Sequence, residues 1–393
     1  MQVLLFTGKG GVGKTTAAAA TGALAASQGV KTLVISTDPA HSLADALGVR
    51  LGSEPIEIEP GLSAQQVDAQ ERFERTWREV QGYLLSALEK VGVDPLEAEE
   101  LTVLPGADEV LALLAVREQI ESGRYDLVIV DCAPTAETLR LLSLPDALSW
   151  YMKRIWPVER RVVRSLRPVL NRVTSVPMPT DVVFDAVERL HAELAAVRAV
   201  LADAEQTAVR LVLTPEAVVV AEARRTMTTL SLYGYRVDAV LANRIIPPGD
   251  PWRDRWAKAQ EVQLAEVEES FAPLPVLRVP YQAAEPVGLE ALVEVGRAAY
   301  GDLDPTGLPP QGEPMDVQRT ADGFTLSIPL PFAEKDQLDL SRRGDELVVT
   351  VASWRRLLTL PSALRRCDVT GAHLVDGRLL VDFVPDPAVW MTT

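Results

Sequence analysis

The chain has few cysteines, and it has fewer basic than acidic residues. Its 393 residues include only two cysteines, Cys132 and Cys367, so a disulfide framework is not expected and a reducing compartment fits. The 39 basic residues are outnumbered by 55 acidic ones, which gives a formal net charge of −16. Because a protein this acidic has no global field that attracts DNA or RNA, we expect no nucleic-acid partner.

A secretory leader and a long apolar run are also missing from the pattern. The first residues enter a strand-like segment directly, with no basic stretch followed by an apolar core. The apolar stretch 17–26 is rich in alanine and too short to span a bilayer. The 47% hydrophobic and 24% charged contents are ordinary for a globular protein. We therefore expect a cytoplasmic protein, long enough for more than one domain.

Apolar, β-branched runs alternate with helical stretches over the first 300 residues. The runs are apolar on both faces, as strands of a covered parallel sheet are. Alternation of such strands with helices predicts an α/β fold with a doubly wound, mostly parallel sheet and right-handed crossovers. The expected strands are 3–7, 31–37, 125–131, 208–214, 237–243 and 275–280.

Three further segments define the expected domain organisation. Residues 68–122 and 143–205 are too long for simple crossovers and read as mostly helical insertions in a first domain, 1–303. Residues 304–314 are rich in proline and glycine and predict a linker. After it the apolar residues alternate with a period of two between Asp-Gly and Gly-Asp turns, which predicts a small all-β sandwich over 315–393.

The glycine-rich turn after the first strand fits the phosphate-binding pattern G-x-x-x-x-G-K-[ST]. Its glycines let backbone N–H groups surround phosphate oxygens, Lys14 reaches the β- and γ-phosphates, and the Thr15 hydroxyl ligates Mg²⁺. The helix that starts near Lys14 adds its N-terminal dipole. The expected nucleotide-binding residues are Gly8, Lys9, Gly10, Gly11, Val12, Gly13, Lys14, Thr15 and Thr16.

A second lysine, Lys9, stands early in the same turn. It lies beside the phosphates but not on the helix, so it is poorly placed to do the work of Lys14. Pointing outward, it could reach a nucleotide held by another subunit and stabilise charge that develops in phosphoryl transfer, as an arginine finger does. The alternative is a solvated surface lysine.

These motifs resemble those of one family of dimeric nucleotide-switch ATPases with a deviant Walker motif. The family comprises the arsenical pump-driving ATPases and the targeting factors for tail-anchored membrane proteins. Six segments occur in the family's order: GKGGVGKTT (8–16), STDPAHSLADALG (36–48), LPGADEVLALL (104–114), DCAPTAETLRLL (131–142), TPEAVVVAEARRTM (214–227) and VLANRI (240–245).

The resemblance implies ATP hydrolysis with Mg²⁺ in a homodimer. Only one phosphate loop is present, whereas the pump ATPase has two fused halves, so two copies of this chain are expected to pair. In the family the lysine that matches Lys9 contacts the nucleotide of the opposite protomer. The residues that match Glu216, Asn243 and Pro280 contact the nucleotide, the latter two at its adenine.

Two aspartates match residues that act on water and metal. The resemblance implies that Asp38 activates or positions the attacking water, a role that suits a carboxylate just after a strand. The alternative for Asp38 is an N-cap of the helix that begins at Pro39. Asp131 ends an apolar strand, as a Walker B aspartate does, and would hold Mg²⁺ through water.

The segment 131–142 resembles the second switch of the family, and the chain departs from the family pattern there at Cys132, Ala136 and Glu137. These departures put the coupling of hydrolysis to shape change in question. No C-x-x-C pair is present, so no structural zinc is expected. Since Cys132 and Cys367 fall in different predicted domains, a metalloid site built on clustered thiols is not expected either.

The function implied by the resemblance is an ATP-dependent switch that holds hydrophobic client proteins. ATP would close the dimer and bring the helical insertions together into an apolar groove for a transmembrane helix, with a membrane-associated receptor as a further partner. Each groove candidate could equally be ordinary helix core. The candidates are Leu84, Leu85, Leu88, Leu111, Leu114, Trp150, Tyr151, Met152 and Trp156.

One other function stays open at this point. The same family resemblance allows a subunit that energises arsenite or antimonite export. A partitioning ATPase would need a basic face or a C-terminal amphipathic helix, whereas this sequence ends in DFVPDPAVWMTT. Electron transfer would need two cysteines facing the dimer axis, and we do not expect it because Cys367 lies beyond the predicted linker. The segment 315–393 resembles the α-crystallin domain of small heat-shock proteins, which predicts either an accessory surface for partners or a sandwich that serves stability alone.

Overall fold

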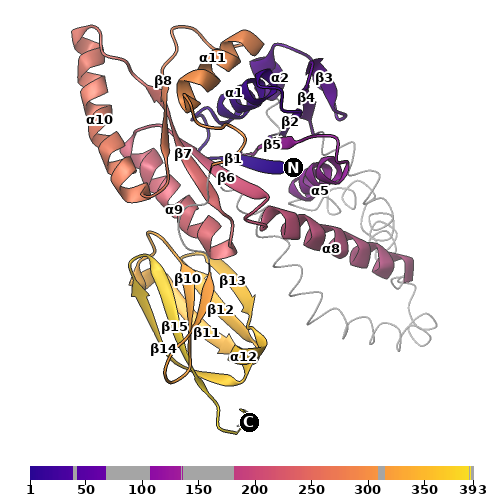
Figure 1. Cartoon of the computed structure of the whole chain (residues 1–393), viewed down its shortest axis with the longest axis vertical. Coiled ribbons are helices and arrows are strands. Elements are labelled where there is room, and N and C mark those ends of the chain that lie inside the picture. Colours follow the sequence, from indigo (N-terminus) through magenta and orange to yellow (C-terminus); the bar gives the residue numbers. More distant parts are fainter. Residues whose placement is uncertain are drawn as a thin grey trace, which may run out of the picture.

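A computed structural model of the chain describes residues 1–38, 42–67, 107–133, 135, 181–308, 315–388 and 390. Within these ranges, the N-terminal part is built around one large sheet flanked by helices, and the C-terminal part is a separate all-β region (Figure 1). This arrangement confirms the predicted fold class.

The large sheet has eight strands in the order β3-β4-β2-β5-β1-β6-β7-β8. All neighbouring strands are parallel except β3 and β4, which form an antiparallel edge that the sequence analysis did not predict. The six predicted strands are confirmed with small changes at their ends. The bounds are β1 Gln2–Thr7, β2 Thr32–Ser36, β3 Ile56–Glu59, β4 Leu62–Gln66, β5 Leu127–Asp131, β6 Thr207–Leu213, β7 Val237–Ile245 and β8 Val276–Pro280.

Helices cover both faces of this sheet, and small residues let them pack closely. A Cβ on Gly296 would lie 2.8 Å from the carbonyl oxygen of Ala20, so the last helix of the ATPase part crosses the first at backbone distance. Parts of the two expected insertions are helical, α5 and α8; residues 68–106 and 141–180 lie outside the described residues. The bounds are α1 Lys14–Ser27, α2 Ser42–Leu47, α5 Ala107–Glu121, α8 Asp181–Leu201, α9 Ala217–Tyr233, α10 Pro251–Phe271 and α11 Leu289–Tyr300. No helix among the described residues is long and apolar enough to cross a bilayer.

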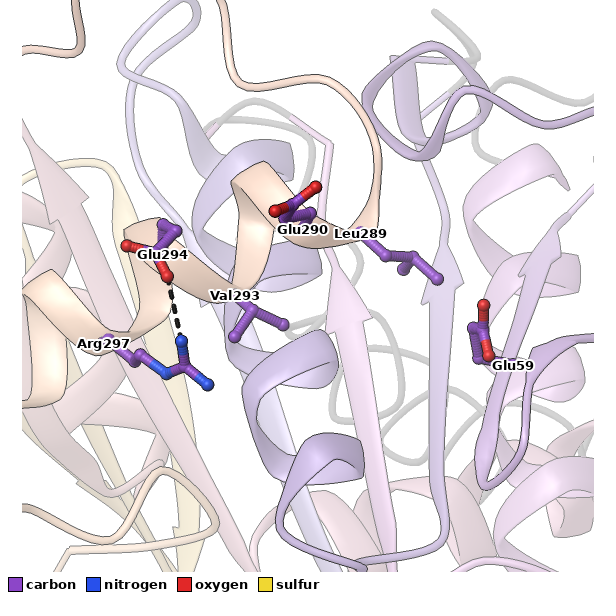
Figure 2. A pocket seen from close by; sticks show the side chains of 6 residues that line it. All are labelled: Glu59, Leu289, Glu290, Val293, Glu294 and Arg297. Atoms are coloured by element: carbon purple, nitrogen blue, oxygen red, sulfur yellow. Dashed lines mark hydrogen bonds and ion pairs between the residues drawn. The ribbon is translucent and has the colours of Figure 1, made fainter.

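A shallow hollow of ≈ 320 Å³ lies between α11 and strand β3 (Figure 2). Three carboxylates line it, Glu59, Glu290 and Glu294, together with Arg297, whose Nη1 is already paired with Glu294 at 2.9 Å. Because this acidic lining would repel phosphate groups, the hollow does not suit a nucleotide.

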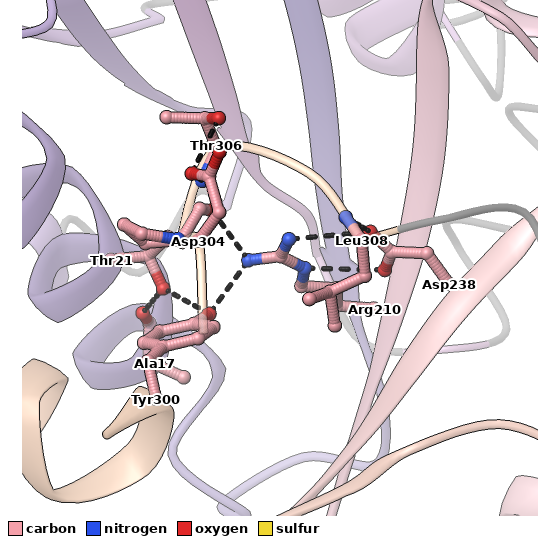
Figure 3. A network of polar contacts seen from close by, with 9 residues as sticks. Ala17, Thr21, Arg210, Asp238, Tyr300, Asp304, Thr306 and Leu308 are labelled. Carbon is pink, nitrogen blue, oxygen red and sulfur yellow. Dashed lines mark hydrogen bonds and ion pairs between the residues drawn. The ribbon is translucent and has the colours of Figure 1, made fainter. Parts of the chain in front are cut away.

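A fully buried arginine, Arg210, links helix α1, which follows the phosphate loop, to the centre of the sheet (Figure 3). The guanidinium of Arg210, on β6, donates to both carboxylate oxygens of Asp238 on β7 at 3.2 Å each. Its Nη1 donates to the hydroxyl of Tyr300 at 2.7 Å, and that hydroxyl shares a hydrogen bond of 2.8 Å with Thr21 on α1. The buried charge is therefore paired and multiply hydrogen-bonded, as its burial requires.

The same network holds the start of the range that was expected to be a linker. Arg210 Nη1 also donates to the carbonyl oxygen of Pro305 at 2.9 Å, and the N–H of Leu308 donates to Asp238 at 3.4 Å. Leu308 is itself buried. Residues 305–308 are consequently part of the packed ATPase region, while 309–314 lie outside the described residues.

The C-terminal region is a sandwich of two antiparallel sheets, ordered β14-β15-β10-β9 and β11-β12-β13. The apolar residues that alternate along these strands are mostly buried, among them Leu326, Ile328, Val349, Val381 and Phe383, while Phe324 is partly buried. The bounds are β9 Asp316–Arg319, β10 Phe324–Pro329, η1 Lys335–Gln337, β11 Leu338–Arg343, β12 Glu346–Val351, β13 Trp354–Thr359, α12 Ser362–Arg365, β14 Cys367–Val375 and β15 Arg378–Pro385.

Among the described residues, helices α9 and α10 of the ATPase part both meet the sandwich. The Tyr233 ring of α9 packs edge-on against Trp354 with centroids 6.3 Å apart. Phe271, the last residue of α10, faces Phe332 with ring centroids 5.2 Å apart. The polar contacts join a side chain of one part to a backbone carbonyl of the other: Thr228 Oγ1 to Pro331 O (2.6 Å), Tyr233 OH to Arg355 O (3.1 Å), and the buried Arg356 guanidinium to Leu232 O.

Candidate nucleotide-binding site

The loop between β1 and α1 depends on glycine at three points. Gly11 and Gly13 have φ of 82° and 93°, in the left-handed region that other residues rarely adopt. At Gly8 the loop passes so close to the carbonyl oxygen of Val212 on β6 that a Cβ would collide with it. The predicted turn is thus a tight strand-to-helix connection at the carboxyl edge of the sheet, where α/β proteins bind their ligands.

The two lysines of the loop lie in different surroundings. Lys14 is 6% exposed, and its Nζ donates to the carbonyl oxygen of Lys9 at 3.4 Å, so its side chain folds back across the loop. The Lys9 side chain is 39% exposed, and its Nζ lies 3.9 Å from Glu222 Oε2 on α9. Lys14 is therefore buried against the loop, whereas Lys9 is the more exposed of its two lysines and faces α9.

The residues predicted to hold magnesium present oxygen atoms in the same place. Asp131, at the end of β5, is fully buried; its Oδ2 accepts from Ser36 Oγ at 3.1 Å, while its Oδ1 has no hydrogen-bond partner among the described residues. Burial raises the pKa of Asp131 to about 6, partly offset by the nearby Thr15 and Ser36 hydroxyls and by the charge of Lys14. A buried carboxylate oxygen without a donor beside the Thr15 hydroxyl fits Mg²⁺, which prefers oxygen ligands.

Asp38 follows β2, and side chains hold both of its backbone polar groups. Its N–H donates to Ser36 Oγ at 3.3 Å, and its carbonyl oxygen accepts from Gln66 Nε2 at 2.9 Å. Gln66 was not among the residues singled out in the sequence. The available signal was a pair of glutamines, Gln65 and Gln66, at the end of a short run that is otherwise strand-like.

The residues expected at the adenine and beside it also lie at this edge. Asn243 on β7 donates from Nδ2 to the carbonyl oxygen of Val12 at 2.8 Å, and a Cβ on Gly13 would collide with this amide. Asn243 therefore packs directly on the phosphate loop. Pro280 ends the neighbouring strand β8, and Glu216 is the exposed residue before α9. The structure brings all three to the loop side of the sheet.

The remaining expectations fall mostly outside the described residues. Cys132 is buried after β5, with its Sγ 3.7 Å from the carbonyl oxygen of Val130. Ala136 and Glu137 lie outside the described residues, as does the side chain of Leu111. Leu114 is partly buried against the core. The other groove candidates, also outside the described residues, are Leu84, Leu85, Leu88, Trp150, Tyr151, Met152 and Trp156.

The parallel sheet and its phosphate loop define a P-loop nucleotide hydrolase. Residues 1–301 match the family model described as anion-transporting ATPase, and residues 321–383 match an HSP20-like domain found in ArsA. The chain belongs to this ATPase family and is an ATPase. The family resemblance and the resemblance of the C-terminal region to small heat-shock domains are both confirmed.

Two of three similar proteins match this chain over almost its whole length. A Streptomyces coelicolor protein named "Uncharacterized protein SCO2128" is 42% identical over 99% of both chains. A Chlorobaculum tepidum protein named "Putative arsenical pump-driving ATPase" is 37% identical over 98% of this chain and 96% of its own. A Paramecium tetraurelia protein named "ATPase ASNA1 homolog 1" is 27% identical over 74% of this chain and 90% of its own.

Proposed function

We propose that the chain works as a homodimeric, magnesium-dependent ATP switch that holds apolar segments of client proteins in a targeting or chaperone role. The position of Lys9 is the observation that carries the proposal. Lys14 is buried against the phosphate loop, while Lys9 is half-exposed and faces α9. A second lysine in that position is of little use to its own nucleotide and is available to the nucleotide of a partner.

The residues at the loop have distinct tasks in this proposal. Lys14 and the loop N–H groups bind the β- and γ-phosphates, and Thr15 and Asp131 hold Mg²⁺, which neutralises charge on those phosphates. Asp38 orients water and accepts its proton as the water attacks the γ-phosphorus and ADP leaves. The partner's Lys9 stabilises the charge that develops on the transferred group.

Mixing two inactive variants tests the trans role of Lys9. In a Lys9→Ala and Asp38→Asn heterodimer, one nucleotide keeps Asp38 in its own subunit and receives Lys9 from the other. Equal mixing therefore restores up to about a quarter of wild-type turnover, since about half of the dimers are mixed and each has one complete site. If Lys9 acts within its own subunit, the mixture stays as inactive as its components.

The client role has its own test. A fluorescent transmembrane-helix peptide binds to Asp38→Asn more tightly with ATP and Mg²⁺ than with ADP, as read by anisotropy, because the unhydrolysed nucleotide keeps the dimer closed. Equal affinity in both nucleotide states contradicts the client role and leaves the complementation result untouched. The proposal includes a membrane-associated receptor and includes neither nucleic acid nor a structural zinc.

A second candidate function is the energising of arsenite or antimonite export, which the printed names of several relatives favour. The two thiols speak against it. Cys132 lies after β5 in the ATPase part and Cys367 begins β14 in the sandwich, and both are buried. Stimulation of turnover by arsenite or antimonite would support this second function; an unchanged rate favours the first.

A further inference from the structure

Strands β2 and β4 end side by side, and their last residues are partners in the sheet. Ser36 pairs with Gln66 in parallel register, and neither side chain is more than 3% exposed. Both side chains reach the same residue, Asp38. Ser36 Oγ accepts the Asp38 N–H at 3.3 Å, and Gln66 Nε2 donates to the Asp38 carbonyl at 2.9 Å. The backbone of Asp38 is thus held on both sides.

The Ser36 hydroxyl extends this arrangement to the metal side of the site. It donates to Asp131 Oδ2 at 3.1 Å while it accepts from the Asp38 N–H. The backbone of Asp38 is therefore connected to the Asp131 carboxylate through one hydroxyl and to β4 through one amide. Of these two contacts, only the one from the Gln66 amide does not involve a group bonded to Asp131. A substitution that removes the Gln66 amide therefore changes the support of Asp38 and leaves the Ser36–Asp131 hydrogen bond in place.

The burial of the Gln66 side chain is energetically unfavourable for a residue that only fills space. Its amide is buried, and its Oε1 has no hydrogen-bond partner among the residues that the structure describes. Burial of a polar atom without a partner is unfavourable, and an apolar residue of the same size would fill this space without that cost. The amide donor at the Asp38 carbonyl is the feature that an apolar residue cannot replace.

We propose that Gln66 is a positioning residue for ATP hydrolysis, which holds the segment after β2 so that the Asp38 carboxylate faces the attacking water. The inference rests on the proposed role of Asp38. Phosphoryl transfer depends on alignment, and displacement of a reacting group by about 1 Å can cost on the order of 100-fold in rate. Because Gln66 lies on β4 and not in the phosphate loop, we expect its effect in kcat and not in nucleotide affinity.

The neighbouring Gln65 provides a matched control. It is also fully buried, its Nε2 also donates to a backbone carbonyl, that of Ser53 at 2.6 Å, and its Oε1 likewise has no hydrogen-bond partner among the described residues. It differs in holding a loop away from Asp38. Gln65→Met and Gln66→Met each remove a buried amide and keep the side-chain volume, so they should lower the melting temperature by similar amounts.

The test compares the full-length variants in steady-state turnover and in ADP-Mg²⁺ binding by calorimetry. We expect Gln66→Met to lower kcat by about 10- to 100-fold with unchanged ADP affinity, and Gln65→Met to stay within about 2-fold of wild type. In an Asp38→Asn background, Gln66→Met should cause little further loss, because the group that it positions is already gone.

Three results would overturn the inference: equal turnover in the two glutamine variants, a loss confined to ADP affinity, or a full additional loss in the Asp38→Asn background. The failure of the proposed function looks different. If Asp38→Asn turns over ATP at the wild-type rate, the catalytic role of Asp38 is wrong, whatever the turnover of Gln66→Met. If the turnover of Asp38→Asn is slow and that of Gln66→Met is normal, only the positioning role of Gln66 is wrong.

Discussion

The Lys9 ammonium lies 3.9 Å from the carboxylate of Glu222, which stands on α9. Both side chains are partly exposed, so the pair is worth less than about 1 kcal/mol. In the proposed dimer, Lys9 has to leave Glu222 before it reaches the nucleotide of the partner. The ion pair therefore competes with dimer closure.

Glu222→Gln should consequently raise turnover at protein concentrations below the dimerisation midpoint, by up to about 5-fold, the equivalent of about 1 kcal/mol. The measurement is turnover per subunit against protein concentration. Glu266→Gln is the matched control, since it breaks the nearby Arg224–Glu266 pair without touching Lys9. A slower Glu222→Gln enzyme would show that Glu222 supports the active arrangement instead.

Asp131→Asn should stabilise the nucleotide-free protein at neutral pH. The pKa of Asp131 is raised from 3.8 to about 6 in the folded state, so folding favours the protonated form and an ionised Asp131 costs stability. This shift in pKa corresponds to a loss of folding stability of roughly 3 kcal/mol at most above pH 6. The loss disappears below pH 4, where Asp131 is protonated in both the folded and the unfolded state. Denaturant unfolding of the wild type and of Asp131→Asn at pH 4 and pH 7.5 tests whether the variant is the more stable protein at the higher pH only.

The same substitution should remove the extra stabilisation that ATP gives in the presence of Mg²⁺, because the amide has no negative charge and replaces one carboxylate oxygen with an NH₂ group, which cannot bind the metal. A gain in apo stability without a loss of magnesium-dependent stabilisation would contradict the metal role and leave the burial argument intact.

Arg210→Met should destabilise the ATPase part by about 3–5 kcal/mol, because it leaves the fully buried Asp238 carboxylate without its partner. Equilibrium urea unfolding gives the value. Arg278→Met serves as the comparison: that arginine pairs with Glu261 and Glu268 at the surface, and its loss should cost less than about 1 kcal/mol. Similar costs for the two variants would mean that Asp238 finds another donor.

Arg356→Met should loosen the contact between α9 and the sandwich. The guanidinium donates to the carbonyl of Leu232 at the end of α9 and packs on Gly234, which ends the helix in a left-handed conformation. Loss of a charged, buried hydrogen bond costs about 1.5–3 kcal/mol. Limited proteolysis between the two parts should therefore speed up, while the exposed neighbour Arg355→Met, which keeps its backbone contact to Tyr233, should behave as wild type.

The sequence was most informative where a buried strand or a compact motif concentrates its signal. Strands such as β1 and β5 are covered on both faces, so their apolar runs stand out without any alternation. The phosphate loop, too, has its essential residues within a few positions. Strand β3, with glutamate at alternate positions on an exposed edge, carries no such run and was missed.

Contacts between distant segments could not be read from the sequence. Gln66 acts on a residue 28 positions earlier, and Glu222 meets Lys9 only because α9 runs beside the loop. Similarly, the Pro- and Gly-rich composition of 304–314 predicted a linker, and the anchoring of Pro305 by Arg210 depends on an arginine 95 positions away. The composition of a segment indicates its local backbone conformation. It does not indicate which distant residue the folded sheet places beside it.

Three hydrogen bonds described between α9 and the sandwich each join a side chain to a backbone carbonyl. A carbonyl is present whatever residue carries it, so the residues at Pro331, Arg355 and Leu232 can change without removing the acceptor. Compensating pairs of substitutions are then not needed to preserve these three hydrogen bonds. A sandwich exchanged between relatives should keep them as long as Thr228, Tyr233 and Arg356 are kept, whereas the ring contacts of Tyr233 with Trp354 and of Phe271 with Phe332 depend on both partners.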